Sequence, residues 1–519
     1  MYKHGYGIEQ PDLDGAFELF TIAAKNGSAA AQYSLGECYS LGLGTSQDIP
    51  KAVYYFRQSA AQEFPQALYM LGHYYYNGEV VETNYSEAFR LYKKAGDKGH
   101  GDAQFSLGIM YKHGIGLDTN DEEALRWFRK AAIQGHSRAQ NNTGSCYYFG
   151  IGTAKDLLEA AGWYRKSAMQ GNPSAQYNLA ECYSNGHGVE QNPKEAFIWL
   201  NKSAEQGHSG AQLQLGMCYF TGVAIDKDYD KAIKYFKLAA DQNNPVAQSS
   251  LAQCYLRGQG TNIDNELGFN YSKLASEAGQ VEGMHQLACC YFNGVGTMKD
   301  FDKAFYWFKE AHDKGHKLSG MALATCYKDG LGTAPSDELS FKCYLELSES
   351  GDSDAQSNVG SCYLLGKGVA MDLEKAIYYF NLAVERNNPS GLVNLAQCYQ
   401  NGNGVEKDEA KAVELYTKAA DQGSLISMFN LAVSYERGDG LFYKDMQGAM
   451  RYYEMAANKG FLPAQERLTQ LKLIMQKVRG KNSNLSKSQM ESTLGSTLMN
   501  SQLPNSVNKE ETKKSCTIM

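Results

Sequence analysis

The chain has 519 residues, of which 43% are hydrophobic and 21% are charged, and its formal net charge is −7 at pH 7. This composition suits a packed interior, and the lack of a basic stripe with interleaved aromatic residues argues against a nucleic-acid-binding protein. No apolar run reaches the roughly 18 residues of a membrane span, and the N-terminus does not have the pattern of a signal peptide. We therefore expect a cytoplasmic protein.

A period of 36 residues organises the chain. From Ala31 to Ser427 one pattern recurs twelve times without an inserted or deleted residue, and residues 1–7 resemble residues 110–116 for the same reason. Periods of this length are typical of solenoid proteins. With Ala31 counted as position 1, position 9 is tyrosine and position 12 is glycine in every repeat, as in Tyr39, Gly42, Tyr75, Gly78, Tyr111 and Gly114.

Each repeat predicts two helices. In the first, apolar or small residues fall at Ala31, Leu35, Gly36, Cys38 and Tyr39, on one face of a 3.6-residue helix. The glycine at position 12 ends this helix in the left-handed conformation, which glycine adopts without strain. The glycine or alanine at position 6 allows a neighbouring helix to come close.

The second helix of each repeat follows an Asp, Asn or Ser residue, which are the residues preferred as N-caps. Its core stripe consists of Ala52, Tyr55, Phe56, Ala60 and their equivalents. All four tryptophans stand at the position of Tyr55, so we interpret them as packing residues. The predicted caps are Asp48, Asn84, Asn120, Asp156, Asn192, Asp228, Asp264, Asp300, Ser336, Asp372, Asp408 and Asp445.

The two ends of the array differ. Residues 1–5 align with the last turn of a first helix and Asp12 opens a complete second helix, so residues 1–30 form a truncated first repeat. We therefore expect further repeat sequence upstream of the given start. Twelve repeats fill residues 31–462, and residues 463–479 lack the repeat tyrosine and glycine, as expected of a capping helix. The predicted fold is an all-α solenoid of twelve to thirteen helix-turn-helix repeats.

The repeat pattern, A-x-x-x-L-G-x-x-Y-x-x-G-x-G followed by K-A-x-x-[WY]-[FY]-x-x-A-A-x-x-G, resembles the Sel-1-like repeat family over residues 1–478. The resemblance implies an α/α superhelix related to tetratricopeptide arrays and used to hold proteins together. Some bacterial members of this family have a disulfide inside each repeat. The second cysteine that such a bond requires is absent here.

Cysteine and histidine residues follow the period and do not converge. Cysteines at position 8 of neighbouring repeats lie about 10 Å or more apart, whereas a disulfide requires Cα atoms within about 7 Å. We interpret them as small buried residues in a reducing compartment. His100, His136, His208 and His316 are also spaced by multiples of 36 residues, too far apart to share a metal. With no catalytic motif in the chain, we expect neither an enzyme nor a cofactor, a metal or a small-molecule substrate.

The variable surface predicts a protein-binding face. By analogy with tetratricopeptide repeats, positions 3, 7 and 10 of the first helix face the concave side. Aromatic residues among polar ones suit a peptide of a partner protein. A second interpretation, that some of these aromatics only pack between adjacent helices, stays open. The candidate binding residues are Tyr33, Tyr69, Tyr76, Phe105, Tyr148, Tyr177, Phe220 and Phe292.

Residues 480–519 leave the period and are rich in Ser, Asn and Lys, which predicts a disordered tail. The last four residues, Cys516, Thr517, Ile518 and Met519, resemble a prenylation box, and the final methionine favours farnesyl on Cys516. One such chain gives only reversible membrane binding. We therefore expect a partner at the membrane to supply the second attachment.

Sel-1-like repeats together with a prenylation box resemble the fungal chitin synthase activators. The resemblance implies a scaffold that is peripheral on the cytosolic face of a membrane and that binds a membrane-embedded synthase or another membrane complex. The chain lacks the long irregular N-terminal region of those proteins. Two alternatives are an adaptor of endoplasmic-reticulum-associated protein degradation, for which no signal peptide is visible, and a general signalling scaffold.

Overall fold

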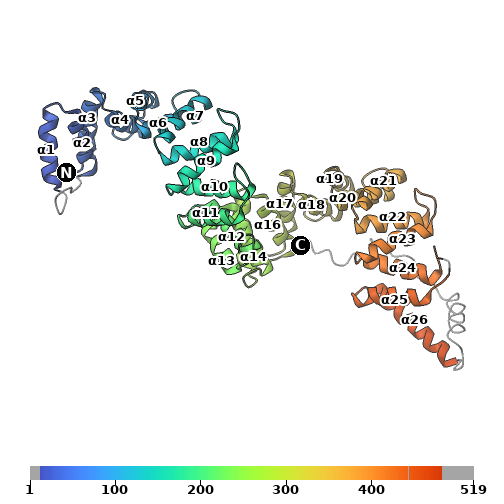
Figure 1. Ribbon diagram of the computed structural model, residues 1–519. Helices are drawn as coiled ribbons and strands as arrows, with labels where there is room; N and C mark the ends of the chain where they lie inside the picture. The colour runs from blue at the N-terminus through green and yellow to red at the C-terminus, as the bar shows by residue number, and fades with distance from the viewer. Residues whose placement is uncertain (1–11, 442, 482–519) are drawn as a thin grey trace. The chain divides into compact units, whose positions relative to one another are not determined.

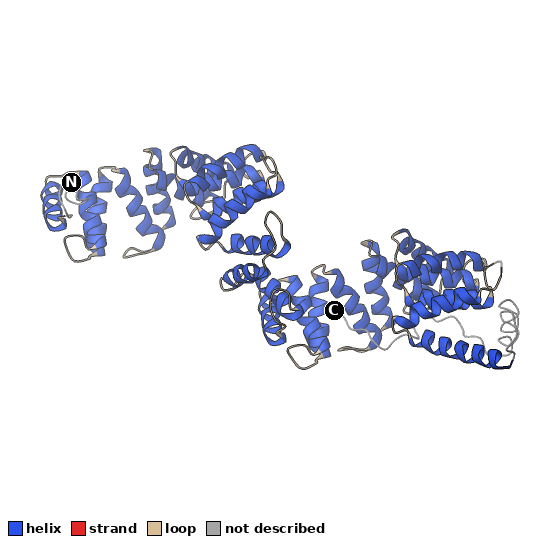
Figure 2. Cartoon of the chain, turned by 60° about the horizontal axis from the view of Figure 1, so that its bottom comes forward, coloured by secondary structure: helices blue, strands red, loops and turns tan. Residues whose placement is uncertain are grey.

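A computed structural model of the chain describes residues 12–441 and 443–481. Over these residues it contains 26 helices and no strand, and each of the twelve complete repeats has one helix pair (Figures 1 and 2). The helices divide into two compact units, residues 1–247 and 248–519, each built of helices that pack on their neighbours along the chain. The predicted all-α solenoid is confirmed.

The first unit contains α1 to α13. Its first helices are α2 (Ala29–Leu41), α4 (Pro65–Asn77), α6 (Gly101–His113), α8 (Ser137–Phe149), α10 (Pro173–Asn185) and α12 (Ser209–Thr221). Its second helices are α1 (Leu13–Lys25), α3 (Ile49–Ala61), α5 (Tyr85–Asp97), α7 (Asp121–Ile133), α9 (Leu157–Met169), α11 (Pro193–Glu205) and α13 (Tyr229–Ala240). The boundary between the units falls inside α14 (Pro245–Arg257).

The second unit contains α15 to α26. Its first helices are α16 (Val281–Asn293), α18 (Lys317–Asp329), α20 (Ser353–Leu365), α22 (Pro389–Asn401) and α24 (Leu425–Arg437). Its second helices are α15 (Asn265–Glu277), α17 (Phe301–Asp313), α19 (Asp337–Glu349), α21 (Leu373–Glu385), α23 (Glu409–Asp421) and α25 (Met446–Asn458). The last helix is α26 (Leu462–Lys481).

Capping residues set the helix ends, as the sequence predicts. At the start of α3, the Lys51 N–H donates to Asp48 Oδ1 over 3.0 Å, and a side chain accepts in the same way at all twelve predicted N-caps. This bond satisfies a backbone N–H that the first helical turn leaves without a partner. Gly42 ends α2 with φ of +70°, and the glycine at position 12 has a positive φ in every repeat.

The invariant tyrosine joins three helices. The Tyr39 carbonyl accepts the Asp48 N–H at 2.9 Å, which ties the end of α2 to the start of α3. The Tyr39 ring stacks on Tyr55 of α3 at 5.7 Å between centroids and meets Phe17 of α1 edge-on at 5.5 Å. The rings of Tyr219 and Tyr363 make the same pair of contacts in later repeats. Position 9 therefore fixes each repeat internally and against the preceding one.

The small residue at position 6 makes room for an aromatic ring. A Cβ added to Gly36 would lie 2.7 Å from the Phe56 ring of α3, which is fully buried. The equivalent rings of Phe128, Phe236 and Phe380 lie against the same position in their own repeats. The neighbour predicted to come close is thus the second helix of the same repeat.

Buried glutamines link successive repeats of the first unit. Gln140 Nε2 donates to the Ala132 carbonyl at the end of α7 over 3.1 Å, and Gln140 Oε1 accepts from Gln170 Nε2 over 2.7 Å. The side-chain pair recurs as Gln32–Gln62, Gln104–Gln134, Gln176–Gln206 and Gln212–Gln242. Because an unpaired buried amide is costly, the side-chain pair fixes the two helices of one repeat, and the bond to a carbonyl such as that of Ala132 fixes the repeat on the preceding one.

The end of the second unit is closed by α26. This helix begins one residue before the predicted capping helix and continues to Lys481, two residues beyond its predicted end. Arg467 of α26 forms a buried ion pair with Glu436, which also accepts the Tyr453 hydroxyl at 2.9 Å. Residues 1–11, which include the truncated first helix, and residues 482–519, which hold most of the predicted tail and the prenylation box, lie outside the described residues.

A matched pair of glycine substitutions tests the contact between repeats. Gly188 and Gly171 both have positive φ, but a Cβ at Gly188 would overlap the Leu157 carbonyl of the preceding helix pair, whereas a Cβ at Gly171 meets nothing within 4 Å. Gly171→Ala should cost about 1 kcal/mol of unfolding free energy from backbone strain. Gly188→Ala should cost roughly twice that or more, because the contact itself must move. Urea unfolding followed by circular dichroism measures both; equal costs would contradict the contact.

Candidate functional site

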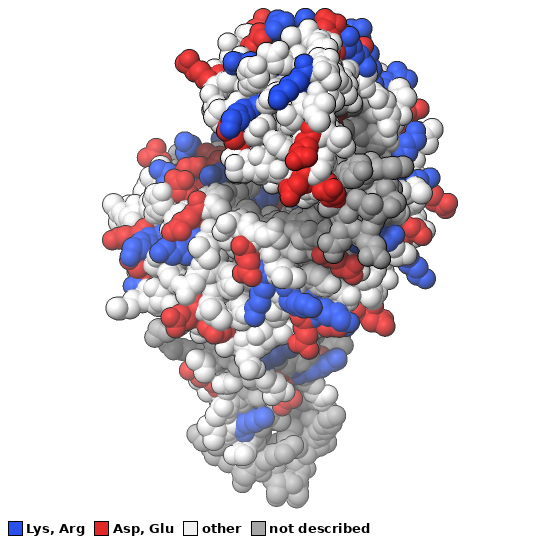
Figure 3. Space-filling view, turned by 90° about the vertical axis from the view of Figure 1, so that its left-hand side faces the viewer, with Lys and Arg blue, Asp and Glu red and all other residues white. Residues whose placement is uncertain are grey.

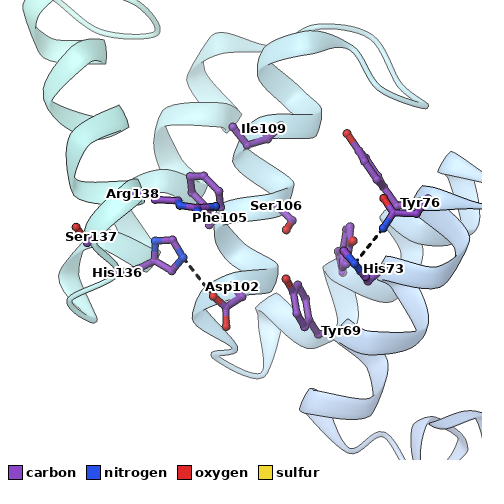
Figure 4. Close-up of a pocket in the computed structure, with 12 residues that line it drawn as sticks. Tyr69, His73, Tyr76, Asp102, Phe105, Ser106, Ile109, His136, Ser137 and Arg138 are labelled. Atoms are coloured by element: carbon purple, nitrogen blue, oxygen red, sulfur yellow. Dashed lines mark hydrogen bonds and ion pairs between the residues drawn. The ribbon is translucent and has the colours of Figure 1, made fainter. Parts of the chain in front are cut away.

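A pocket of about 470 Å³ opens across three successive first helices of the first unit (Figure 4). Its volume lies in the range of ligand-binding pockets. Because the three helices belong to different repeats, the stacking of repeats forms the pocket. Its lining consists of Tyr69, His73, Tyr76 and Asn77 of α4, Tyr92 of α5, Asp102, Phe105, Ser106 and Ile109 of α6, and His136, Ser137 and Arg138 at the start of α8.

Helical spacing explains why these side chains share one face. Tyr69, His73 and Tyr76 stand at positions 3, 7 and 10 of their repeat, which lie on one side of a 3.6-residue helix. Phe105 and Ile109 occupy positions 3 and 7 of the next repeat and line the same pocket. Of the eight candidate aromatics, the structure brings Tyr69, Tyr76 and Phe105 together here, and their role in binding stays a prediction.

The other candidate aromatics lie outside this pocket and pack against their own repeat or the next one. Those at position 10 meet aromatics of the following second helix, as Phe220 meets Tyr229 at 5.3 Å and Phe292 meets Phe301 at 5.3 Å. Phe292 is buried. Tyr148 is half-buried, and its hydroxyl lies 2.8 Å from His187 Nδ1. Tyr33 and Tyr177 are also half-buried.

Aromatic residues at position 3 stack on histidines of the next repeat. The ring centroids are 4.8 Å apart for Tyr69 and His100, 4.7 Å for Phe105 and His136, and 4.9 Å for Tyr177 and His208. An aromatic ring at position 3 therefore packs on the next repeat and is still partly exposed to solvent. Part of each half-buried ring supports the next repeat, and Tyr69 and Phe105 also line the pocket.

The same histidines cap helices, a role that the sequence analysis missed. His100 Nδ1 accepts the Ala103 N–H at 3.3 Å and His136 Nδ1 accepts the Ala139 N–H at 3.1 Å, at the N-termini of α6 and α8. His208 and His316 cap α12 and α18 in the same way. A useful signal was the spacing, since each histidine stands three residues before position 1 of a repeat. Burial lowers the pKa of His100, which favours the neutral ring that can accept this bond.

Some polar side chains of the pocket have hydrogen-bond partners and one does not. His136 Nε2 lies 3.3 Å from Asp102 Oδ1, and Asn77 Nδ2 lies 3.0 Å from His73 Nε2. Burial raises the pKa of Tyr69, and the Asp102 carboxylate adds to this effect. Arg138, by contrast, has no hydrogen bond or ion pair to another of the described residues. In Figure 4 its side chain extends from α8 toward Phe105.

A row of hydrogen-bonded polar side chains joins α16 to the start of α18 in the second unit. Glu282 Oε2 lies 3.2 Å from His316 Nε2, and His316 Nδ1 lies 2.9 Å from Ser319 Oγ. Ser319 Oγ lies 2.9 Å from His285 Nδ1, and Cys289 Sγ lies 3.6 Å from the other nitrogen of His285. The sequence analysis missed this cluster because Glu282 and His316 are 34 residues apart.

The order of groups in this row resembles a catalytic triad, but the burial of the nucleophile argues against catalysis. Ser319 is 0% exposed, so a substrate does not reach its hydroxyl. Burial raises the pKa of Cys289 to about 12, which keeps the thiol protonated and unreactive. Burial, together with the nearby His316, lowers the pKa of His285 to about 4. These side chains cap α18 and join two repeats.

The cysteines occupy the buried positions predicted for them. All eleven cysteines of the described residues are free, and most are buried. Burial raises the pKa of Cys146, Cys182 and Cys254 to about 11, as expected of thiols that serve as small apolar residues. Across residues 12–441 and 443–481, no group of three or more His, Cys, Asp or Glu side chains is arranged to hold a metal.

Charges are mixed on the surface. In the view of Figure 3, acidic and basic side chains are interspersed among uncharged ones. Among the helices that the structure describes, none combines the length and the apolar composition of a membrane-spanning segment.

Comparison with known proteins agrees with the repeat architecture. The Sel1 repeat pattern matches thirteen segments that together span residues 1–316 and 321–461. The crystal structure of c5321, a protective antigen of uropathogenic Escherichia coli with an SLR fold, is similar with 31% identity and a TM-score of 0.73, over 87% of this chain and 97% of that one. A Sel1 repeat protein from Oxalobacter formigenes is 29% identical over 59% of this chain and 90% of its own, with a TM-score of 0.47.

His285 should make the stability of the second unit depend on pH. Its pKa of about 4 in the folded protein lies below the ordinary value of about 6.5, so the unfolded chain takes up the proton first. The contribution of neutral His285 to the free energy of unfolding is therefore complete above pH 6.5. It is lost as the pH falls toward 4, and the loss is at most about 3 kcal/mol. Hydrogen exchange of α16 and α18 between pH 4 and 7 measures it. His285→Gln should flatten the dependence; an unchanged pH profile would contradict this assignment.

Proposed function

Because the chain belongs to the Sel1 repeat family, whose solenoid fold is typical of protein-binding scaffolds, we propose that it is a non-catalytic scaffold or adaptor. Its partners bind along the face formed by positions 3, 7 and 10 of the first helices, which we call the groove and which includes the pocket across α4, α6 and α8. The observation that carries this proposal is the convergence of side chains from three repeats on one pocket of about 470 Å³.

The composition of the pocket supports a peptide ligand. Tyr69, Tyr76 and Phe105 offer rings to apolar side chains, and Asn77 and Ser106 are polar groups beside them. Partly exposed aromatics held by a rigid scaffold are effective anchors for a bound peptide, since little side-chain entropy is lost when the partner binds. Contacts like those of Tyr39, which recur at Tyr219 and Tyr363, hold neighbouring helices in place within each unit.

The proposal includes a membrane tether at Cys516. A farnesyl group gives reversible membrane binding, and a membrane-resident partner held in the groove would add a second attachment. The most concrete form is an activator or localiser of a membrane enzyme such as chitin synthase, on the cytosolic face. Its support is the resemblance of the repeats and of residues 516–519 to the chitin synthase activators.

A pair of isoleucine substitutions tests the groove. Ile109 lines the pocket, whereas Ile133 ends α7 outside it and is 69% exposed. Ile109→Glu should reduce capture of the partner from solubilised membranes at least tenfold, because it places a charge among the anchoring rings. Ile133→Glu should leave capture unchanged. Affinity capture with quantitative mass spectrometry measures both, after thermal melts confirm that each variant folds.

The identity of the captured protein decides between forms of the proposal. A glycosyltransferase supports the synthase activator, whereas components of a ubiquitin ligase support a degradation adaptor. Equal capture by the Ile109→Glu and Ile133→Glu variants would contradict binding in the groove.

The tether has its own test. Cys516→Ser should shift most of the protein from the membrane fraction to the soluble fraction, because the thiol that receives the lipid is lost. Fractionation of cells that express both forms measures the shift, and intact mass should show a farnesyl group and the loss of residues 517–519 in the parent protein. Unchanged fractionation together with an unmodified C-terminus would refute the tether.

A further inference from the structure

Arg138 departs from the repeat pattern at the edge of the pocket. Arg138 directly precedes position 1 of its repeat, and in the other eleven repeats the residue at this place is never a lysine or an arginine. The equivalent residues are Ala30, Gln66, Asp102, Ser174, Gly210, Val246, Glu282, Leu318, Asp354, Ser390 and Ile426. The architecture of the repeat therefore does not require an arginine at this position.

Helix stability does not explain Arg138 either. It is the second residue of α8, in the first turn, where the helix dipole disfavours a cation. It is exposed and has no hydrogen bond or ion pair to another of the described residues. An arginine that weakens its own helix and pairs with none of the described residues is available to an external anion.

The titratable neighbours of Arg138, which are His136 and Asp102, already bond to each other or to the backbone. His136 Nδ1 accepts the Ala139 N–H, so the ring hydrogen lies on Nε2, which faces Asp102 Oδ1 at 3.3 Å. The Asp102 carboxylate thus faces a donor, whereas the Arg138 guanidinium has no acceptor among residues 12–441 and 443–481. With its hydrogen on Nε2, the His136 ring donates a hydrogen bond to Asp102 but does not cancel the carboxylate charge. Arg138 is the charged side chain of the pocket whose N–H groups bond to no other described residue.

Beside Arg138 the pocket is aromatic and apolar. Phe105 and Ile109 of α6 line the pocket together with Tyr69 of α4 (Figure 4). Tyr92 of α5 also lines it. The surface therefore complements a ligand that carries an apolar side chain next to one negative charge. A guanidinium binds a carboxylate through two parallel hydrogen bonds, which gives geometric selectivity as well as attraction.

We propose that the pocket binds an acidic peptide, with an aromatic or aliphatic side chain on Phe105 and Ile109 and an adjacent Asp or Glu carboxylate on Arg138. This inference rests on the proposed function and names the chemistry of its partner. A single carboxylate fits better than a phosphate, because a phosphate carries up to two charges and Asp102 would repel the second. The charge of Arg138 selects the partner, and the rings supply its contact area.

Labelled peptides test the proposal directly. Fluorescein-labelled peptides of Gly and Ser carry one Phe and one Glu, separated by zero to three residues, and matched sets have Gln, Lys or phosphoserine in place of Glu. Anisotropy titrations of the full chain should show at least one Glu peptide binding tenfold or more tightly than its Gln counterpart. Arg138→Glu should abolish this preference and favour the Lys peptide by a similar factor. Arg129→Glu, an exposed arginine of α7 outside the pocket, should change neither.

Several outcomes would overturn the inference. These are equal binding of the Glu and Gln peptides, retention of the preference in Arg138→Glu, tighter binding of the phosphoserine peptide, and binding to phosphatidylserine vesicles that depends on Arg138 while peptide binding does not. If these occur while Ile109→Glu still prevents capture of the partner, the groove binds proteins but Arg138 does not select them. If Ile109→Glu has no effect on capture, the proposed function itself fails.

Discussion

Each repeat must dock on the preceding one through backbone and side-chain contacts that leave no spare volume, and the rest of the structure depends on this constraint. The ring and carbonyl of Tyr39 join α1, α2 and α3, and the loop at Gly188 lies against the backbone of the preceding helix pair. An inserted residue would move both contacts out of register. This explains why the 36-residue period continues from Ala31 to Ser427 without a change in length.

A rigid stack leaves its other positions free to differ. Positions 3, 7 and 10 of the first helices carry aromatic, aliphatic, polar and charged residues in different repeats, and only some of these side chains, such as Tyr69 on His100, also contact the next repeat. Where different side chains of neighbouring repeats meet, they form a local cluster that the other repeats do not have. The Asp102–His136–Arg138 group has exposed charge and an open pocket, whereas in the other group His285 and Ser319 are buried and His316 is half-buried. Exposure separates a surface suited to binding from a cluster that holds two repeats together.

Histidine has two structural functions here that depend on its neutral form. As an N-cap, His136 accepts a backbone N–H through one nitrogen and presents the other to Asp102, so one ring links a helix end to the pocket. As a buried residue, His285 is bonded on both sides of its ring. The cap at His136 needs a bare Nδ1, because that nitrogen accepts a backbone N–H. Burial lowers the pKa of His285, which favours its neutral form between α16 and α18.

The amino-acid pattern alone determined the repeat length, the two helices of each repeat, the twelve N-caps and the glycine that ends each first helix. These features are local, since a cap and a helix face involve residues within one or two turns. Only the tertiary structure decided which variable residues meet. Glu282 lies 34 residues from His316, and Arg138 lies 69 residues from Tyr69 in the pocket that both line. Such meetings depend on how one repeat is rotated onto the next, and the periodicity of one sequence does not contain that angle.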